Sequence, residues 1–252
     1  MRGLRASVTF LTRVKVGGEI RWPEDIALGV PWFPVVGCAI GLLVAAVYAA
    51  GRSILPSLVA AALAIAVGVW ATGGFHEDGL ADTADAFGGR RSPEETIRIM
   101  KDPRLGSYGV LALVLTMLIR IGSVSALEGA AAFVVLPAAG AMSRAGAIAL
   151  LAGPVAPADG LGAAYASVVG GGQLAIALGV GGAIGIAALG SVAVPAAASV
   201  AVVCLIARRL ARRRIGGVTG DVLGAAQQTG EIVVLLVGVG VLHRGWVDLP
   251  WW

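Results

Sequence analysis

Charged residues are scarce in this 252-residue chain. They make up 13% of it, against roughly 25% in a soluble domain, whereas 58% of the residues are hydrophobic. No charged residue occurs between Gly160 and Ala207. Together with a mean hydropathy of +0.88, this shortage argues against an ordinary soluble domain. It predicts an all-α, polytopic integral membrane bundle, because only helices or closed barrels satisfy the backbone inside a bilayer.

Cysteine is almost absent as well. Cys38 and Cys204 both lie in apolar stretches, so we expect two packing residues rather than a disulfide or a metal pair. The chain has no Walker motif, no GxGxxG after a strand and no Cys/His metal pattern. These absences exclude the common soluble nucleotide-binding folds.

Apolar stretches predict about seven spans in a single membrane-embedded domain, residues 1–252. We expect spans at 30–50, 54–74, 108–127 and 131–152, two within 172–207 with a turn near Gly190, and a last one at 231–242. The last span is short unless it begins near Leu223. Gly37 and Gly41, spaced four apart, predict close helix contact in the first span.

Residues 1–29 form a basic N-terminal segment. Leu4, Val8 and Leu11 share one helical face beside arginines, which predicts a helix lying at the membrane interface; a disordered basic tail is the alternative. The segment has no uncharged apolar core of the length that a cleavable signal peptide needs, so we expect the first span to act as the insertion signal.

Basic residues gather in three clusters that hold fifteen of the nineteen lysines and arginines. The clusters are Arg2, Arg5, Arg13, Lys15 and Arg21; Arg90, Arg91, Arg98, Lys101 and Arg104; and Arg208, Arg209, Arg212, Arg213 and Arg214. Seven spans would place all three on the same side as the N-terminus. By the positive-inside rule, that side is the cytoplasm.

The longest polar loop, residues 76–106, contains an acidic motif. On a helix, Asp78, Asp82 and Asp85 fall at i, i+4 and i+7 and therefore point the same way. Three such carboxylates repel one another unless a cation lies between them. Mg²⁺ takes oxygen ligands and keeps positions open for phosphate, so it is the expected cofactor. A solvated acidic helix end is the alternative.

Later in the loop, Ser92 and Pro93 predict the start of a short helix that runs to Met100.

Further polar features are expected on the same side. They are Lys101-Asp102-Pro103-Arg104, the turn Gly216-Gly217-Val218-Thr219-Gly220-Asp221, and two arginines inside spans, Arg120 and Arg144. An ionisable group in a span is costly unless it is paired or faces water. The arginines therefore predict either an anion site or a structural ion pair, for example with Glu231.

This combination suits a phosphate-bearing substrate bound with Mg²⁺. The metal offsets charge in phosphoryl transfer, basic side chains hold phosphate oxygens, and glycines let backbone N–H groups approach. His76, beside the acids, could act as a general base or could be only a hydrogen-bonded neighbour.

Three motifs resemble the signature of the cobalamin synthase (adenosylcobinamide-GDP ribazoletransferase) family. They are GGFHEDGLADTAD at 73–85, MKDPRLGSYG at 100–109 and GGVTGDVLGA at 216–225; FLTR at 10–13, WFPVVG at 32–37 and SR at 143–144 also fit. The resemblance covers nearly the whole chain in order. It implies a Mg²⁺-dependent enzyme of late cobalamin biosynthesis in the inner (plasma) membrane of a bacterial or archaeal cell. Such an enzyme joins adenosylcobinamide-GDP to α-ribazole or its 5′-phosphate and releases GMP.

Onto these motifs we place the following expected roles. The metal ligands are Asp78, Asp82, Asp85 and Asp102. The substrate-binding residues are Lys101, Arg104, Arg144 and Thr219. The catalytic residues are His76, Asp82, Asp85 and Asp221. The chain departs from the expected pattern in two places. Pro103 replaces a small polar residue, and the pair Gln227-Gln228 stands where an acid is expected, so that Glu231 or Asp221 would have to serve instead.

Other readings of the sequence stay open. A CDP-alcohol phosphotransferase also uses an aspartate ladder with Mg²⁺, but its arginine after the first aspartates and its later spacing are missing here. An ion-coupled transporter predicts acids at mid-membrane and two related halves, and no internal repeat is evident. A scaffold without catalysis does not explain three polar motifs on one side. We expect membrane lipid but no nucleic acid as a partner, and homo-oligomers or association with other cobalamin-assembly enzymes are possible.

Overall fold

The computed structural model describes residues 1–21, 23–156 and 168–245. In these ranges the regular structure is helical, apart from one isolated parallel bridge between Val155 and Val218. The expected all-α fold class is therefore confirmed.

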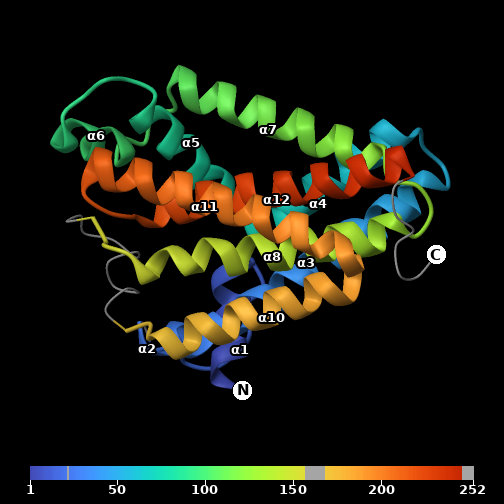
Figure 1. Cartoon of the computed structure of the whole chain (residues 1–252), viewed down its shortest axis with the longest axis horizontal. Coiled ribbons are helices and arrows are strands. Elements are labelled where there is room, and N and C mark those ends of the chain that lie inside the picture. The colour runs from blue at the N-terminus through green and yellow to red at the C-terminus, as the bar shows by residue number, and fades with distance from the viewer. Residues whose placement is uncertain (22, 157–167, 246–252) are drawn as a thin grey trace.

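Seven helices of at least 16 residues form the bundle in the described part of the chain (Figure 1). They are α3 (Phe33–Arg52), α4 (Ser57–Thr72), α7 (Ser107–Ser125), α8 (Ala131–Ala149), α10 (Gly171–Leu189), α11 (Ala193–Ile215) and α12 (Gly220–Arg244). The shorter elements are α1 (Arg2–Leu11), α2 (Glu24–Gly29), η1 (Val30–Trp32), α5 (Phe75–Phe87), α6 (Pro93–Met100), η2 (Leu150–Ala152) and η3 (Gly190–Val192).

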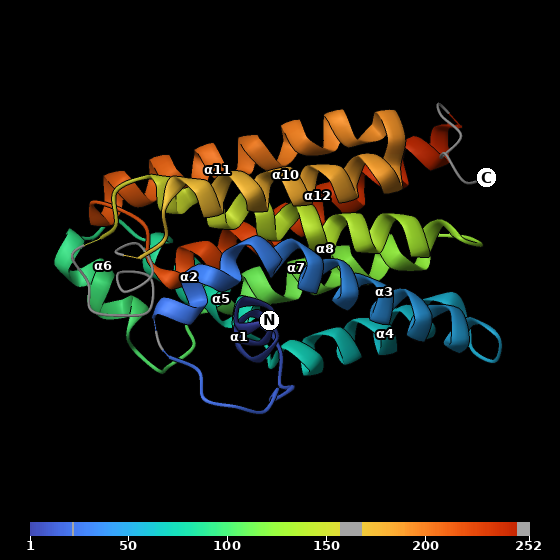
Figure 2. The same ribbon diagram turned by 90° about the horizontal axis from the view of Figure 1, so that it is seen from below.

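Within the described residues, five helical stretches are long and apolar enough to cross a membrane, and a sixth results if α4 and α5 are counted as one broken span. One of the five, Gly171–Ile215, contains both α10 and α11. The chain turns back at η3 between them, as Figures 1 and 2 show, which agrees with the turn expected near Gly190. The protein is thus a multi-pass membrane protein. The expected count of about seven spans is approximate, because five or six stretches of the described residues meet the length and hydropathy criteria.

The last helix is longer than the 231–242 stretch that hydropathy indicates. It begins at Gly220, because the Thr219 side chain caps its first turn by accepting a hydrogen bond from the Val222 N–H at 3.3 Å. The polar residues between Asp221 and Glu231 therefore lie on a helix inside the bundle rather than in a loop.

Helix α8 is the centre of the bundle, since every residue from Ala131 to Ile148 except Phe133 is buried. It contacts α3, α10 and α12. A Cβ at Gly37 would lie 2.2 Å from the Gly140 carbonyl oxygen, and one at Gly41 would lie 2.3 Å from the Leu136 carbonyl oxygen. The two glycines thus allow the close approach of α3 to α8 that their spacing predicted.

The N-terminal segment is folded. Ser7 on α1 donates a hydrogen bond to the Gly29 carbonyl oxygen at 2.7 Å, and Ala6 and Leu11 are buried. The disordered tail is therefore the wrong alternative for residues 1–11, while their place at a membrane interface stays a prediction.

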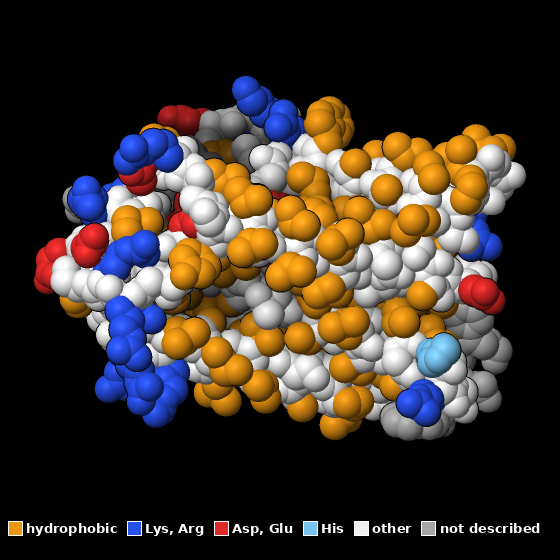
Figure 3. Space-filling model, turned by 90° about the horizontal axis from the view of Figure 1, so that it is seen from above, with side chains coloured by type: hydrophobic (Ala, Val, Ile, Leu, Met, Phe, Trp, Pro, Cys, Tyr) orange, Lys and Arg blue, Asp and Glu red, His pale blue; other side chains and the backbone are white. Residues whose placement is uncertain are grey.

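Side-chain type divides the surface along the long axis (Figure 3). Apolar side chains cover most of the length, whereas lysines, arginines and acids gather at the end that carries α6. This is the distribution expected when the long sides face lipid and one end faces water.

Candidate active site

The acidic motif lies directly after a sharp bend. Gly73 and Gly74 have φ values of 75° and 73°, a region that other L-residues adopt only at a cost. Helices α4 and α5 are consequently bent by 91° relative to each other. The bend directs α5, with its aspartates, back against the bundle.

Helix α5 packs closely on the start of α12. A Cβ at Gly79 would lie 2.9 Å from the Asp221 carbonyl oxygen, so only glycine fits there. This approach joins acids that are far apart in the sequence. Burial raises the pKa of the Asp82 carboxyl, and the nearby charges of Asp78, Asp221 and Asp85 raise it further. The expected same-face placement of the α5 aspartates is thus extended by a fourth carboxylate from α12.

Asp85 has a second set of contacts. Its carboxylate accepts hydrogen bonds from the backbone N–H of Gly106 at 2.7 Å and of Gly109 at 2.8 Å. These are N–H groups at the start of α7 that have no partner within the helix. Asp85 therefore caps α7 and ties α5 to the end of the polar loop. No sequence spacing pointed to this contact.

The second motif lies in the exposed loop between α6 and α7. Arg104 donates to both carboxylate oxygens of Asp102, at 2.9 and 2.6 Å. These hydrogen bonds lower the pKa of the Asp102 carboxyl to about 2. Lys101 beside them is exposed. Asp102 and Arg104, expected to bind metal and substrate respectively, therefore pair with each other at the water-facing end.

The third motif connects this loop to α12. Besides capping α12, the Thr219 hydroxyl lies 3.3 Å from the Met100 sulfur at the end of α6. The short helix α6 begins as expected, with Ser92 accepting a hydrogen bond from the Glu95 N–H. The structure thus gathers the three sequence motifs at one end of the molecule (Figure 1).

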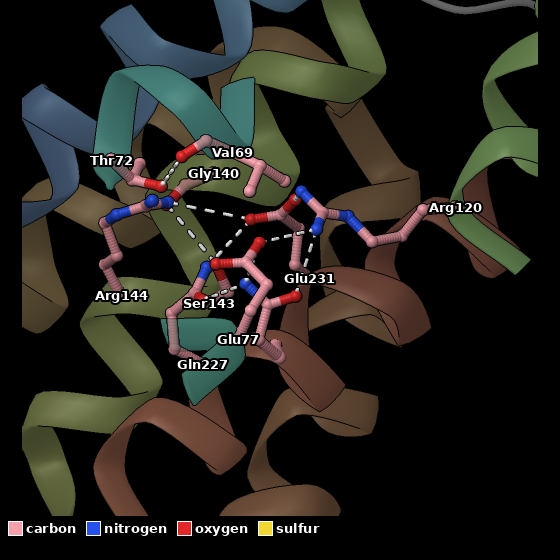
Figure 4. A network of polar contacts seen from close by, with 10 residues as sticks. Val69, Thr72, Glu77, Arg120, Gly140, Ser143, Arg144, Gln227 and Glu231 are labelled. Atoms are coloured by element: carbon pink, nitrogen blue, oxygen red, sulfur yellow. Dashed lines mark hydrogen bonds and ion pairs between the residues drawn. The ribbon is translucent and has the colours of Figure 1, made fainter. Parts of the chain in front are cut away.

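The arginines inside the spans belong to a buried polar network (Figure 4). Arg120 forms ion pairs with Glu77 at 2.8 Å and Glu231 at 3.0 Å, and Arg144 lies 3.7 Å from the other oxygen of Glu231. Arg144 also donates to the Gly140 carbonyl oxygen at 3.0 Å. Both arginines therefore form the structural ion pairs that were one alternative, and contact of Arg144 with a substrate stays a prediction.

The two glutamines that depart from the expected pattern complete this network. Gln227 donates to Glu231 at 2.8 Å and to the Ser143 hydroxyl at 3.1 Å. Gln228 donates to Glu77 at 3.1 Å and accepts a hydrogen bond from Arg120 at 3.2 Å. Their amides, which can donate and accept at once, link acids and bases across four helices. The only sequence signal for their role is that they are polar residues in an apolar helix.

His76 faces this network. Its ring is buried, with 5% exposed, and its Nδ1 has no hydrogen-bond partner in the described structure. It lines a cavity of about 20 Å³ together with Glu77, Arg120 and Arg144. That volume holds about one water molecule.

The carboxylates offer the oxygen ligands that Mg²⁺ prefers, but they do not form a closed cage. Within the described residues, no group of three or more acids, histidines or cysteines lies together closely enough to hold a metal by itself. Mg²⁺ usually keeps several waters and is held by one or two carboxylates plus substrate phosphates. The adjacent Asp78, Asp82 and Asp221 fit that open kind of site.

These features define a helical, multi-pass membrane protein with an acidic site and a basic loop at its polar end. The chain belongs to the cobalamin-5-phosphate synthase family, whose family model matches residues 3–239.

Curated relatives cover most of the chain. It is 41% identical to a protein of Bradyrhizobium diazoefficiens over 240 residues, which are 93% of this chain and 92% of the relative. It is 43% identical to one of Azorhizobium caulinodans over 95% of both chains, and 36% identical to one of Ralstonia nicotianae over 99% of this chain and 95% of the relative. All three relatives are named adenosylcobinamide-GDP ribazoletransferase. No solved structure matches the chain.

Proposed function

We propose that this protein is a membrane transferase that joins adenosylcobinamide-GDP to α-ribazole or its 5′-phosphate and releases GMP. Family membership and the names of the relatives support the reaction. The structural observation that carries it is the convergence of the α5 aspartates with Asp221 at the end where Lys101 and Arg104 are exposed. Acids that can hold a metal, beside exposed cations, suit a diphosphate substrate.

The reaction is a phosphoryl transfer. A hydroxyl oxygen of the ribazole forms a new bond to the phosphorus that carries the aminopropanol arm. The bond from that phosphorus to the bridging oxygen of the diphosphate breaks, and GMP leaves with this oxygen. The hydroxyl proton passes to a base. Catalysis of this kind depends on positioning and on charge stabilisation.

Asp78 and Asp82, with Asp221 opposite them, are the residues that we assign to Mg²⁺. When bound, the metal would neutralise phosphate charge. The chemistry of the donors supports this assignment. The carboxylates are hard oxygen ligands from two helices, and their negative charges repel one another unless a cation lies between them. Asp85 is assigned a positioning role, because both of its oxygens already hold the start of α7.

Lys101 and Arg104 are assigned to the substrate diphosphate. Arg104 is held by Asp102 at the surface, and a phosphate could replace that carboxylate as its partner. Thr219 lies at the N-terminus of α12, where backbone N–H groups favour an anion. His76 is the proposed proton acceptor, because its Nδ1 has no hydrogen-bond partner in the described structure and the residue lines the small cavity. Arg144 lines the same cavity and is assigned to substrate binding.

We place this end of the molecule on the cytoplasmic side. The three clusters of basic residues support that assignment, since Lys and Arg near the ends of spans favour the cytoplasm.

The test is an assay with detergent-solubilised protein. Adenosylcobinamide-GDP, α-ribazole and Mg²⁺ are mixed, and cobalamin and GMP are followed by chromatography. We expect product from the wild type, no product with a chelator, and a loss of orders of magnitude in Asp82→Asn. Glu94→Gln is the matched control, because it also removes a carboxylate at this end but from an exposed position on α6.

Each outcome has a distinct meaning. Product with an unaffected Asp82→Asn variant would keep the reaction and reject the metal assignment. No product from folded wild-type protein would reject the reaction. The CDP-alcohol phosphotransferase and the ion-coupled transporter would then be the hypotheses to test.

A further inference from the structure

An apolar groove of about 370 Å³ runs along α8 between α10 and α11. Helices α10 and α11 both pack on α8, as Figures 1 and 2 show. Small residues form much of its lining: Gly181 and Gly182 on α10, and Ala145 and Gly146 on α8. None of the groups described at the proposed active site lines this groove.

One end of the groove opens into a basic pocket. Arg208, Arg209, Arg212 and Arg213 line that pocket together with Leu205, and no acid among the described residues takes part in its lining. Leu205 and Arg208 line both the groove and the basic pocket. The apolar and the basic surfaces are therefore continuous.

The spacing along α11 explains this continuity. Leu205, Arg208, Arg209, Arg212 and Arg213 follow the i, i+3, i+4 pattern and share one helical face. All four arginines are exposed, and none of them forms an ion pair within the described residues. The face therefore presents uncompensated positive charge next to apolar surface at the charged end of the bundle.

We propose that this surface binds an anionic phospholipid, with an acyl chain in the groove and the phosphate at the arginines. A membrane protein meets this ligand at the depth where apolar spans give way to charged ends. The apolar groove needs an apolar occupant, and the arginines need an anion that lies within reach of it. A phospholipid with net negative charge supplies both in one molecule.

The first test compares lipids on the purified full chain in a neutral detergent. Dioleoylphosphatidylglycerol and dioleoylphosphatidylcholine, which share their acyl chains, are titrated and bound lipid is counted by native mass spectrometry. We expect phosphatidylglycerol to bind at least tenfold more tightly. A parallel titration with glycerol phosphate separates a lipid from a free phosphate ion, and we expect it to compete poorly.

The second test changes each half of the site separately. Gly182→Leu fills the groove, because no atom of the described residues lies within 4 Å of a Cβ built at Gly182. Gly179→Leu is the matched control: it also has open space on α10 but does not line the groove. We expect Gly182→Leu to weaken phosphatidylglycerol binding at least tenfold and Gly179→Leu to leave it unchanged.

Arg209→Gln with Arg212→Gln removes two charges from the basic pocket. Each arginine near an anionic headgroup contributes about a fivefold gain in affinity, so removing the pair should weaken binding by about thirtyfold. Arg90→Gln with Arg98→Gln removes the same charge from exposed positions outside the groove and should have no effect on the bound lipid. Arg208 is left intact because its guanidinium packs against Gly153.

Several results would overturn the proposal. Equal binding of the two lipids would reject a headgroup site, and equal effects of the two leucine variants would reject the groove. Competition by glycerol phosphate at the same concentration as the lipid would assign the arginines to a free phosphate. A dimer that Gly182→Leu converts to a monomer would assign the groove to a second copy of the chain.

Discussion

Arg120 and Glu77 form a buried ion pair, 2.8 Å between Nη1 and Oε1, that joins α7 to α5 directly beside the acidic motif. The partners of Arg120 extend this link to Glu231 on α12 and from there to Arg144 on α8. The network contains two acids and two arginines, so their charges cancel. This balance allows four ionised groups to remain inside an apolar bundle, and it holds α5 in place from within.

Removing one charge from this network should destabilise the folded protein. We expect Arg120→Met to lower the free energy of unfolding by about 3–5 kcal/mol, because Glu77 and Glu231 would both be left without their main partner. The measurement is thermal or denaturant unfolding in detergent.

The double variant Arg120→Met, Glu77→Gln is the control for that cause. It should lose clearly less stability than the sum of the two single variants, because it leaves no unpaired Glu77 charge. Strictly additive losses would show that the two residues do not interact.

The bend at Gly73 and Gly74 should be needed for activity although neither glycine belongs to the acidic cluster. Placing an alanine in the left-handed region costs about 1–2 kcal/mol per residue. We expect Gly73→Ala with Gly74→Ala to lower stability by about 2–4 kcal/mol and to reduce turnover by moving α5. Unfolding and product formation are measured together.

Gly122→Ala is the matched control for the substitutions at the bend. Gly122 lies within α7, and no atom of the described residues is within 4 Å of an added Cβ. The substitution should therefore be neutral or slightly stabilising. Full activity in the double variant would mean that the bend does not position the site.

Substitutions of Asp82 and of Asp85 should have different effects on the Mg²⁺ requirement of the enzyme. Asp85→Asn weakens two charge-assisted hydrogen bonds to the start of α7, so we expect a stability loss of about 1–3 kcal/mol. The Mg²⁺ concentration for half-maximal turnover should not change. Asp82→Asn should raise that concentration and lower the maximal rate. A Mg²⁺ titration of both variants decides the question, and a raised requirement in Asp85→Asn would restore Asp85 as a metal ligand.

The contact between α5 and α12 should limit what fits at Gly79. An alanine there would bring its Cβ to 2.9 Å from the Asp221 carbonyl oxygen, so the helices must separate at a cost of about 1–3 kcal/mol. We expect Gly79→Ala to lower activity at least tenfold and to raise the Mg²⁺ requirement. Gly240→Ala, an open position on α12, is the comparison, and identical behaviour of the two variants would contradict the proposed role of this contact.

Local rules explain which features were predicted correctly. Ser92 and Pro93 marked the start of α6, and the glycines at 37 and 41 marked a close helix contact, because caps and small-residue spacing act within a few residues. Helix α12 begins at Gly220, close to the earlier of the two starts that the sequence left open, near Leu223, and well before Glu231. Hydropathy reports only apolar residues, whereas the helix extends through polar ones that the bundle satisfies.

The sequence by itself determined that this is a helical membrane protein with an aspartate ladder at one end, because composition, span length and helical periodicity are properties of contiguous residues. Only the tertiary structure decided which side chains the polar groups meet. Asp85 finds its partners 21 and 24 residues away, and Glu77 meets Gln228 across 151 residues. Such pairings depend on how each helix is rotated and how closely it packs, and one chain's residue order does not encode those contacts locally.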